Sequence, residues 1–473
     1  MSQKAKIAIV GGGVAGASTA LYLTNLGLEV TLFERESSLV NGPPFCHLHA
    51  GGNLYPDISD EQCIKLLKQS IDFLRFYPHV VDYRPTVIAL PSYCSSQPTN
   101  LLPRLEKLQK EYQLLIDNDP QNGVLGESKN YYRLYTKEKI EAIENGEMTH
   151  DLDKWMIPVA QNINLSKVQF PLILVQEYGL NLFRLGASVG LALEKLEGVN
   201  VKSSTSVIDI KKDNNGWSIT SQKEQETQQE HFDYLINATG FRTGKIDDFL
   251  DVPCQKMVEF KAAYVTQWEE GKKTLFPEII FHGERGTPQG MGQFTPYPDG
   301  YFQLHGMTNE ITLYKDGLVS STPLSCQPEL NPNFIEKIEN AWTTAEVEQR
   351  TNSAIRHLSQ FIPNFSEAKV GSKPLFGAQQ IPGDDPSLRV AEVSFPTKRY
   401  ARCEIVKVSS VIDMIEAIAE ELIGLGYVNK KLPFESMIDE SEEEITNVAK
   451  EIATKREYPL GLVELSVSKK SIL

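Results

Sequence analysis

The sequence predicts an α/β fold in which a parallel sheet carries an inserted α+β domain built on a mostly antiparallel sheet. Three observations lead to this expectation. The chain opens on a strand, a glycine turn, a helix and a second strand. It returns to short strands at residues 199–240, and patterns typical of antiparallel strands lie between residues 256 and 312. Since 473 residues exceed what one hydrophobic core usually serves, we expect two or three domains.

The opening unit has the pattern of a dinucleotide-binding turn. Residues 7–10 are a short apolar run typical of a buried parallel strand, and a helix is expected over residues 15–26. Between them, Gly11, Gly13 and Gly16 supply G-x-G-x-x-G. These glycines allow a sharp turn, a close approach of backbone to a pyrophosphate, and tight packing of helix on strand.

A carboxylate follows the second predicted strand, residues 29–33. Glu34 lies about 20 residues beyond the glycines, where an acidic side chain can accept hydrogen bonds from a ribose diol. The loop over residues 37–53 comes next and contains two histidines. Long loops at this place of a nucleotide-binding unit are often functional.

Hydrophobic periodicity predicts the elements of the middle of the chain. The expected helices are 60–76, 101–115 and 181–196, and the expected strands are 82–91, 131–134, 199–201, 207–210 and 217–219. Thr136 is expected to cap a further helix, and the polar run 222–230 is expected to form a hairpin tip. A buried strand beginning at Tyr234 ends in Ala238, Thr239 and Gly240, small residues that let the backbone approach a ligand.

Antiparallel strands are predicted at residues 257–268, 278–282 and 301–307. The two-residue period of a strand places Tyr301, Gln303 and His305 on one face, which is polar and could line a cavity. Downstream we expect a helix over 341–361, strands over 373–380 and 388–395, and a long helix over 409–425. Ser441 and Glu444 fit a capping box, so the acidic run there is expected to open a surface helix.

Composition and charge narrow the class of protein. The net charge of −15 disfavours nucleic acid and anionic membranes as main partners. The six cysteines contain no C-x-x-C pair, so we predict neither a metal site nor a disulfide framework. No apolar run approaches the ~20 residues of a transmembrane helix, and the first strand begins too close to Met1 for a signal peptide. The expected location is cytoplasmic.

The glycine turn, Glu34 and the strand ending in Ala238-Thr239-Gly240 together resemble FAD-dependent oxidoreductases of the D-amino-acid oxidase (DAO) superfamily. The resemblance is one of layout and extends from residue 4 to about residue 425. It implies a Rossmann-like FAD-binding domain made of residues 1–56, 160–250 and 372–428, a substrate-binding domain made of residues 57–159 and 251–371, and a C-terminal helical tail, residues 429–473.

The resemblance also implies roles for matching positions. The glycines would hold the pyrophosphate, Glu34 the adenosine ribose, and the backbone of Val207 the adenine, while the loop 47–52 would lie against the isoalloxazine. The predicted FAD-binding residues are Gly11, Gly13, Val14, Ala15, Gly16, Glu34, Arg35, His47, His49, Ala50, Gly51, Val207, Ala238, Thr239 and Gly240. One departure is that the stretch 398–406 lacks the glycine-rich turn that relatives usually carry before the last helix.

Oxidation by FAD requires a group that accepts the proton of the substrate heteroatom, and positive charge near the flavin N1–C2=O. The predicted catalytic residues are His49, His305 and Tyr301, with His49 favoured as the base because an unperturbed histidine titrates near pH ~6.5. A flavin-orienting role for His49 is an open alternative. Further candidates are His282 and Arg285 in the pocket, Arg399 and Arg402 near the flavin, and Cys46, His47, His49 or Cys403 for covalent attachment.

The predicted function is hydride removal from a carbon that bears an amine or a hydroxyl, in an amino acid or a 2-hydroxy acid. The electrons would pass to O2 or a quinone. The alternatives are a flavin-dependent monooxygenase or halogenase, a plain NAD dehydrogenase, and a non-catalytic flavin-binding subunit. Monooxygenases usually carry a G-D-A-x-H segment, whereas Gly383-Asp384 here lies in a proline-rich turn.

Overall fold

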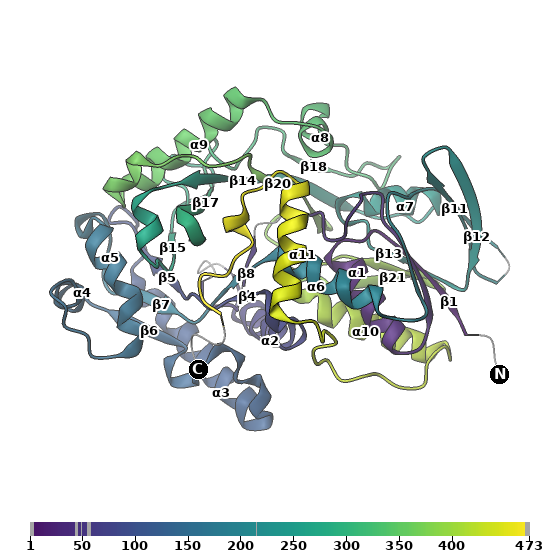
Figure 1. The fold of residues 1–473 in the computed structure, drawn as a ribbon, viewed down its shortest axis with the longest axis horizontal. Helices are drawn as coiled ribbons and strands as arrows, with labels where there is room; N and C mark the ends of the chain where they lie inside the picture. Colours follow the sequence, from purple (N-terminus) through teal and green to yellow (C-terminus); the bar gives the residue numbers. More distant parts are fainter. Residues whose placement is uncertain (1–3, 43–45, 49, 54–57, 214, 469–473) are drawn as a thin grey trace.

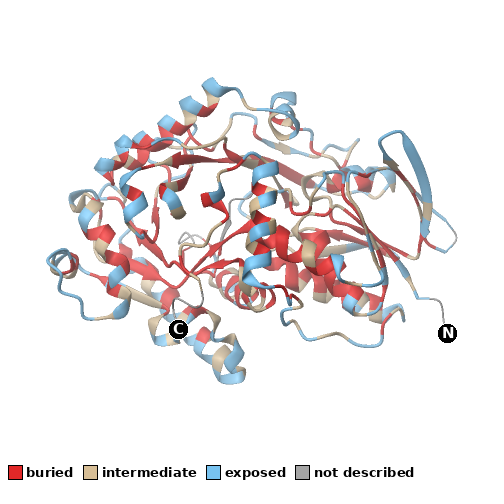
Figure 2. Ribbon diagram, in the orientation of Figure 1, coloured by how far each residue is buried: buried red, intermediate tan, exposed pale blue. Residues whose placement is uncertain are grey.

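The computed structural model describes residues 4–42, 46–48, 50–53, 58–213 and 215–468. Two large sheets dominate the fold, one on the right of Figure 1 and the other on the left, and the C-terminal helix α11 (Glu442–Lys455) crosses between them. Buried residues concentrate along the strands of both sheets and in the helices beside the right-hand one, whereas the hairpin at the right edge is largely exposed (Figure 2).

The first sheet is the parallel one. Its strands, in spatial order, are β21 (Val393–Thr397), β22 (Tyr400–Cys403), β13 (Tyr234–Asn237), β1 (Lys6–Val10), β2 (Glu29–Phe33) and β9 (Val199–Lys202). All neighbours are parallel except β21 and β22. Val10 stands opposite Phe33 on one side and Asn237 on the other. The carboxyl ends of β1, β2 and β13 therefore meet at one edge, the usual place for a ligand in such sheets.

Helices cover this sheet and connect it to the C-terminal tail. α1 (Val14–Asn25) packs on α6 (Leu182–Glu194) and α10 (Val411–Gly424), and α11 packs on α6. Most apolar side chains of β1 and α1 are buried, and those of Ile7, Ile9 and Leu21 are fully so. Burial of such side chains contributes roughly 1.5–3 kcal/mol each.

The second sheet has ten strands and is mostly antiparallel, with β15 and β5 as its parallel pair. Its strands are β18 (Leu318–Ser320), β14 (Lys256–Gln267), β17 (Tyr301–Gly306), β16 (Gly292–Pro296), β15 (Glu278–Phe281), β5 (Thr86–Ala89), β7 (Leu172–Val175) and β6 (Tyr132–Tyr135), with β19 (Lys369–Val370) and β20 (Leu375–Pro382) beside β14. Helix α9 (Thr344–Ser359) packs on β14, β16 and β17. Just beyond α9, the ring of Phe361 stacks on that of Phe281 in β15, with ring centroids 4.2 Å apart.

Smaller elements complete the fold. One small sheet contains β10 (Ser206–Lys212), β11 (Trp217–Lys223) and β12 (Glu226–Phe232), and another contains β3 (Cys46–His47), β8 (Gly179–Leu180) and β4 (Val81–Asp82). The remaining helices are α2 (Asp60–Phe76), α3 (Leu102–Asn118), α4 (Lys137–Glu144), α5 (Ile157–Asn162), α7 (Thr243–Phe249) and α8 (Pro332–Glu339). No helix of the described residues is both long and apolar enough to cross a bilayer.

The predicted fold class, an α/β protein with a Rossmann-like parallel sheet and a mostly antiparallel second sheet, is confirmed. Most predicted elements lie within a few residues of their observed bounds, and Thr136 and Ser441 cap their helices as expected. The polar run 222–230 is not only a hairpin tip, because its ends continue as β11 and β12.

One prediction near the C-terminus is wrong. Of the expected strand 388–395, only the last residues belong to a strand, β21, which forms the edge hairpin with β22. The strand that pairs with β13 in the parallel sheet is β22, a short segment whose pattern did not mark it as a strand. The expected helix 341–361 is confirmed as α9, and an unpredicted helix, α8, precedes it. The division into domains stays a prediction, although β7 and β20, assigned to the FAD-binding segments, pair with the second sheet.

Candidate active site

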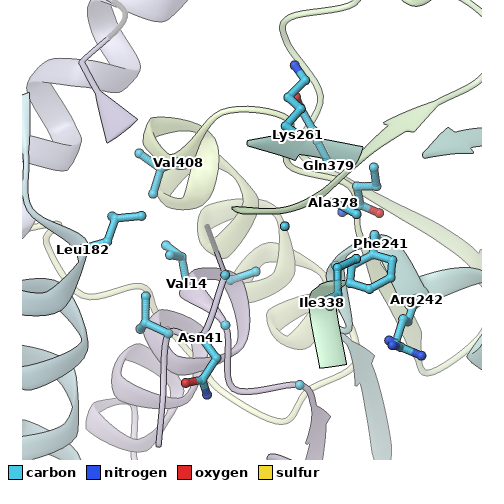
Figure 3. A pocket seen from close by; sticks show the side chains of 18 of the residues that line it. Val14, Asn41, Leu182, Phe241, Arg242, Lys261, Ile338, Ala378, Gln379 and Val408 are labelled. Atoms are coloured by element: carbon cyan, nitrogen blue, oxygen red, sulfur yellow. The ribbon is translucent and has the colours of Figure 1, made fainter. Parts of the chain in front are cut away.

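A cavity of about 1370 Å³ connects the carboxyl edge of the parallel sheet with the polar face of the second sheet. Its size exceeds the ~300–1000 Å³ of pockets that hold drug-sized ligands. It therefore has room for a dinucleotide together with a small molecule. In Figure 3, Val14 at the start of α1, Leu182 at the start of α6 and Val408 before α10 line one part of this space.

The glycine turn forms one end of the cavity. Gly11 has a φ of 102°, and a Cβ there would lie 2.5 Å from the Ala238 carbonyl oxygen, while a Cβ at Gly16 would lie 1.8 Å from the Gly11 carbonyl oxygen. By contrast, no atom lies within 4 Å of where a Cβ of Gly13 would be. Gly11 and Gly16 therefore serve the packing of turn and helix, whereas Gly13 opens space beside the uncapped N-terminus of α1, where N–H groups can receive an anion.

Glu34 lies beyond the turn and is buried. Its Oε2 accepts a hydrogen bond from the Gly12 amide at 2.6 Å, and its Oε1 accepts one from the Glu36 amide at 2.8 Å. Burial raises the pKa of this carboxyl, against the lowering effect of the two backbone donors. Arg35 also lines the cavity, but its guanidinium faces Glu339 at 3.5 Å.

The tip of β13 lies beside the glycine turn at the same end of the cavity. Ala238, Thr239 and Gly240 line the cavity, together with Val207. Asn237 fixes this tip because its fully buried Nδ2 donates to the Thr243 carbonyl at 2.9 Å and its Oδ1 accepts from Thr239 Oγ1 at 2.8 Å. The sequence marked the small residues but not this buried amide.

The loop before α2 approaches the cavity beside α6, since β3 pairs with β8, which leads into α6. His49 lies outside the described residues, and so do the side chains of Cys46 and His47. Ala50 and Gly51 are buried, and neither contributes to the cavity lining, whereas Asn53 does. Glu177 lies beneath this loop, and burial raises its pKa to about 8.

The opposite end of the cavity is built from the second sheet. Gln293 stands opposite both Ile280 and His305 in the register, so the three form one row across β15, β16 and β17. All three line the cavity, as do His282 and Lys261. The predicted polar face of β17 therefore reaches the cavity with Gln303 and His305.

The titratable groups at this end are mostly buried. Burial lowers the pKa of His282 to about 4 and also lowers the pKa of Lys261, whose Nζ lies 3.2 Å from the Glu259 carboxylate. His305 Nδ1 lies 3.4 Å from Thr312 Oγ1. Lys261, which the sequence did not single out, points along the cavity near Gln379 (Figure 3). No sequence motif marks Lys261 as a candidate site residue.

Several predicted side chains lie elsewhere. Tyr301 does not line the cavity. Its ring packs against Gly461 of the tail, so closely that a Cβ at Gly461 would lie 2.7 Å from the ring. Arg285 pairs with Glu259. Arg399 occupies the turn between β21 and β22 at a φ of 63°, and Arg402 is held by Asp247 at 3.2 Å, so neither lines the cavity.

Cys403 and the segment after it line the cavity at the place where relatives usually have a glycine-rich turn. Burial raises the pKa of the Cys403 thiol, which disfavours the thiolate that covalent attachment would require.

The C-terminal tail forms a wall that the sequence did not predict. Ile452, Lys455, Arg456 and Tyr458 line the cavity, so α11 is more than the surface helix expected. Arg456 donates to the carbonyls of Val40 at 3.1 Å and of Leu39 at 2.9 Å. The tail thereby holds the loop that follows Glu34.

The residues present fit FAD. The open space at Gly13, the free amides of α1 and the carboxylate of Glu34 match pyrophosphate and ribose. Among the described residues, no group of three or more histidine, cysteine or acidic side chains could hold a metal ion.

Comparison with known proteins finds one family model and several solved structures that this chain resembles. The family model described as FAD dependent oxidoreductase (DAO) matches residues 6–155. Comparison of the sequence with curated proteins gives no match. Among solved structures, glycerol-3-phosphate dehydrogenase from Bacillus halodurans, complexed with FAD, is 13% identical with a TM-score of 0.58 and covers 97% of this chain and 74% of its own.

Two further solved structures share the fold. Glycine oxidase from Geobacillus kaustophilus is 12% identical with a TM-score of 0.55, covering 92% of this chain and 100% of its own. L-amino acid deaminase from Proteus vulgaris is 13% identical with a TM-score of 0.56, covering 94% and 97%. The predicted family resemblance, FAD as the cofactor and an oxidoreductase as the enzyme class are confirmed by the family match. This chain has the fold of the FAD-dependent oxidoreductases of the DAO family, and its residues 6–155 carry that family's sequence signature.

Proposed function

We propose that this enzyme oxidises a small substrate at a carbon that bears an amine or a hydroxyl, in an amino acid or a 2-hydroxy acid, and passes the electrons to O2 or a quinone. The observation that carries this proposal is the continuity of the cavity from the glycine turn to the polar row of the second sheet. A cofactor at one end and a substrate at the other would share one enclosed space.

Bound FAD would accept the hydride from the substrate carbon. The chain supplies the remaining functions. The turn at Gly13 and the α1 amides would bind the pyrophosphate, and Glu34 would bind the ribose. His305 would take the proton of the amine or hydroxyl, because it lines the cavity and its Nδ1 lies near Thr312. His49 is the second candidate for this role, on the sequence alone.

Lys261 would bind the substrate carboxylate. Lys261 lines the cavity, and among the described residues the carboxylate paired with its Nζ is that of Glu259, which also pairs with Arg285. A positive charge in a partly buried site binds a carboxylate more strongly than in water. The names of similar structures, which include an amino acid deaminase and a glycerol-3-phosphate dehydrogenase, support amine and hydroxyl substrates equally.

The test is anaerobic reduction of the enzyme-bound flavin by a panel of amino acids, N-methyl amino acids, 2-hydroxy acids and glycerol phosphate. We expect bleaching of the flavin absorption by one chemical class. Re-oxidation is then followed with O2 and with a soluble quinone, to identify the acceptor. Protein that binds FAD but is reduced by no member of the panel would contradict the proposal.

A cytoplasmic location belongs to the same proposal. Its support is the scattered cysteine pattern and the free thiols of the five described cysteines. Cell fractionation tests it.

A further inference from the structure

The loop before α2 places an unpaired amide in the cavity. Asn53 lines the cavity and is only 6% exposed. Among the residues that the structure describes, neither its Oδ1 nor its Nδ2 has a hydrogen-bond partner. Leaving a buried polar group unpaired costs about 1–3 kcal/mol, so native proteins rarely tolerate two such atoms on one side chain. A buried carboxamide of this kind indicates a ligand that supplies the missing partners.

A buried carboxyl group fixes the backbone that carries Asn53. Glu177 is fully buried, and its Oε1 accepts hydrogen bonds from the amides of Gly52 at 2.5 Å and Asn53 at 3.3 Å. The Tyr131 hydroxyl, 3.5 Å from Glu177 Oε1, donates to the Ala50 carbonyl at 3.1 Å. A Cβ on Gly52 would lie 2.8 Å from Glu177 Oε1, so the contact needs glycine at this position.

We propose that the Asn53 carboxamide binds FAD and that Glu177 is the residue that positions it. The carboxamide offers one acceptor and two N–H donors, which complement the adjacent N–H and C=O groups of the flavin pyrimidine ring. The ligand is the cofactor rather than the substrate because the loop belongs to the nucleotide side of the cavity. Its strand β3 pairs with β8 next to Leu182, which faces Val14 of α1 in Figure 3, whereas the proposed substrate groups lie on the second sheet.

The experiment measures FAD affinity and is independent of turnover. Apoprotein is titrated with FAD by fluorescence quenching, and the melting temperature of the apoprotein is recorded. Asn53→Ala is expected to weaken FAD binding about tenfold, the loss of one or two hydrogen bonds, while the apoprotein melting temperature stays the same or rises. Asn340→Ala is the matched control, since this amide also lines the cavity but already donates to Glu336 Oε2 at 2.8 Å.

Glu177 variants separate positioning from folding. Glu177→Gln keeps an acceptor for the two amides and should retain FAD affinity, whereas Glu177→Ala should lose it to the extent that Asn53→Ala does. In the double variant with Asn53→Ala the two losses should not add, because both act through one contact. Should Glu177→Ala fail to fold, Asn53→Ala and Glu177→Gln still decide the outcome.

A folded Asn53→Ala protein whose FAD affinity stays within twofold of wild type would overturn the inference, and so would a raised substrate KM at unchanged FAD affinity. The inference rests on FAD as the cofactor but not on the proposed substrate. Wild-type apoprotein that takes up no FAD would overturn the cofactor itself, whereas failure of the substrate panel alone leaves the Asn53 measurement unaffected.

Discussion

The two ends of the cavity are built in different ways. The end of the cavity that we propose for the nucleotide, the nucleotide end, is made largely of backbone, from the turn at Gly11–Gly16 and the tip of β13, with Glu34 as its main side chain. The opposite end is made of side chains, such as Lys261, Gln293 and His305, from strands of the second sheet. A backbone site needs only local geometry, whereas a side-chain site needs the correct register of several strands.

This difference predicts how each end responds to substitution. At the nucleotide end, side chains that fill space should abolish FAD binding, whereas the truncation of a side chain should weaken it by about tenfold at most. At the opposite end, truncation should affect chemistry and substrate binding while FAD remains bound. Five substitutions test the contrast, from the largest expected effect to the smallest.

Gly13→Glu should abolish FAD binding, with at least a hundredfold loss of affinity. The new side chain would project into the open cavity, and its negative charge would repel the negatively charged pyrophosphate. The fold should be kept, since no atom lies within 4 Å of the new Cβ. FAD titration and circular dichroism check both statements. Gly190→Glu adds the same charge at an open position of α6 outside the cavity and should bind FAD normally.

His305→Ala should slow the reduction of bound flavin by about 10²–10⁴-fold, the usual contribution of a general base. FAD affinity should be unchanged because the side chain lies at the other end of the cavity. Stopped-flow reduction under anaerobic conditions measures the rate, with His231→Ala, an exposed histidine paired with Asp213, as control. An unchanged rate would assign the proton transfer to another group, and His49→Ala is then the next variant.

Lys261→Met should raise the KM for a carboxylate substrate about tenfold or more, through loss of one charge-assisted hydrogen bond. The maximal rate of flavin reduction should change less than the KM. Steady-state kinetics with a substrate and its uncharged amide analogue check the effect, and the amide should lose little. Equal losses for both compounds would exclude a contact between Lys261 and the carboxylate.

Arg456→Ala should lower the free energy of unfolding by about 1–3 kcal/mol, since the guanidinium bonds to the carbonyls of Leu39 and Val40. Because these bonds hold the loop after Glu34, FAD affinity should fall only severalfold. Thermal melts of apoprotein and holoprotein measure both. Lys373→Ala, a cavity-lining lysine paired with the exposed Glu457, is the control and should change neither.

The smallest effect on FAD affinity is expected for Glu177→Gln, which is tested through stability instead. The folded pKa of Glu177, about 8, lies above the ordinary value, so the folded state binds more protons and the stability of the apoprotein should fall as the pH rises from about 4.5 to about 8. Glu177→Gln should flatten this part of the profile. Chemical denaturation at a series of pH values provides the comparison, and an identical slope in both proteins would contradict the shift.

Part of the fold could be predicted element by element. β2 and α2 have the predicted bounds, and the capping residues Thr136 and Ser441 lie where expected, because these signals are contained within a few residues. The strand β22 escaped prediction because four residues between a hairpin turn and a loop carry no periodic signal. It is a strand because β13 pairs with it.

The candidate site divides in the same way. The sequence by itself determined the strand, the glycine turn and the position of Glu34 at one end of the cavity, because their geometry is encoded in about thirty consecutive residues. Only the tertiary structure decided that Lys261 and Asn53 face the cavity, that Tyr301 does not, and that the tail closes one wall. These placements depend on strand register and on contacts between segments far apart in the chain, and no local pattern of residues specifies either.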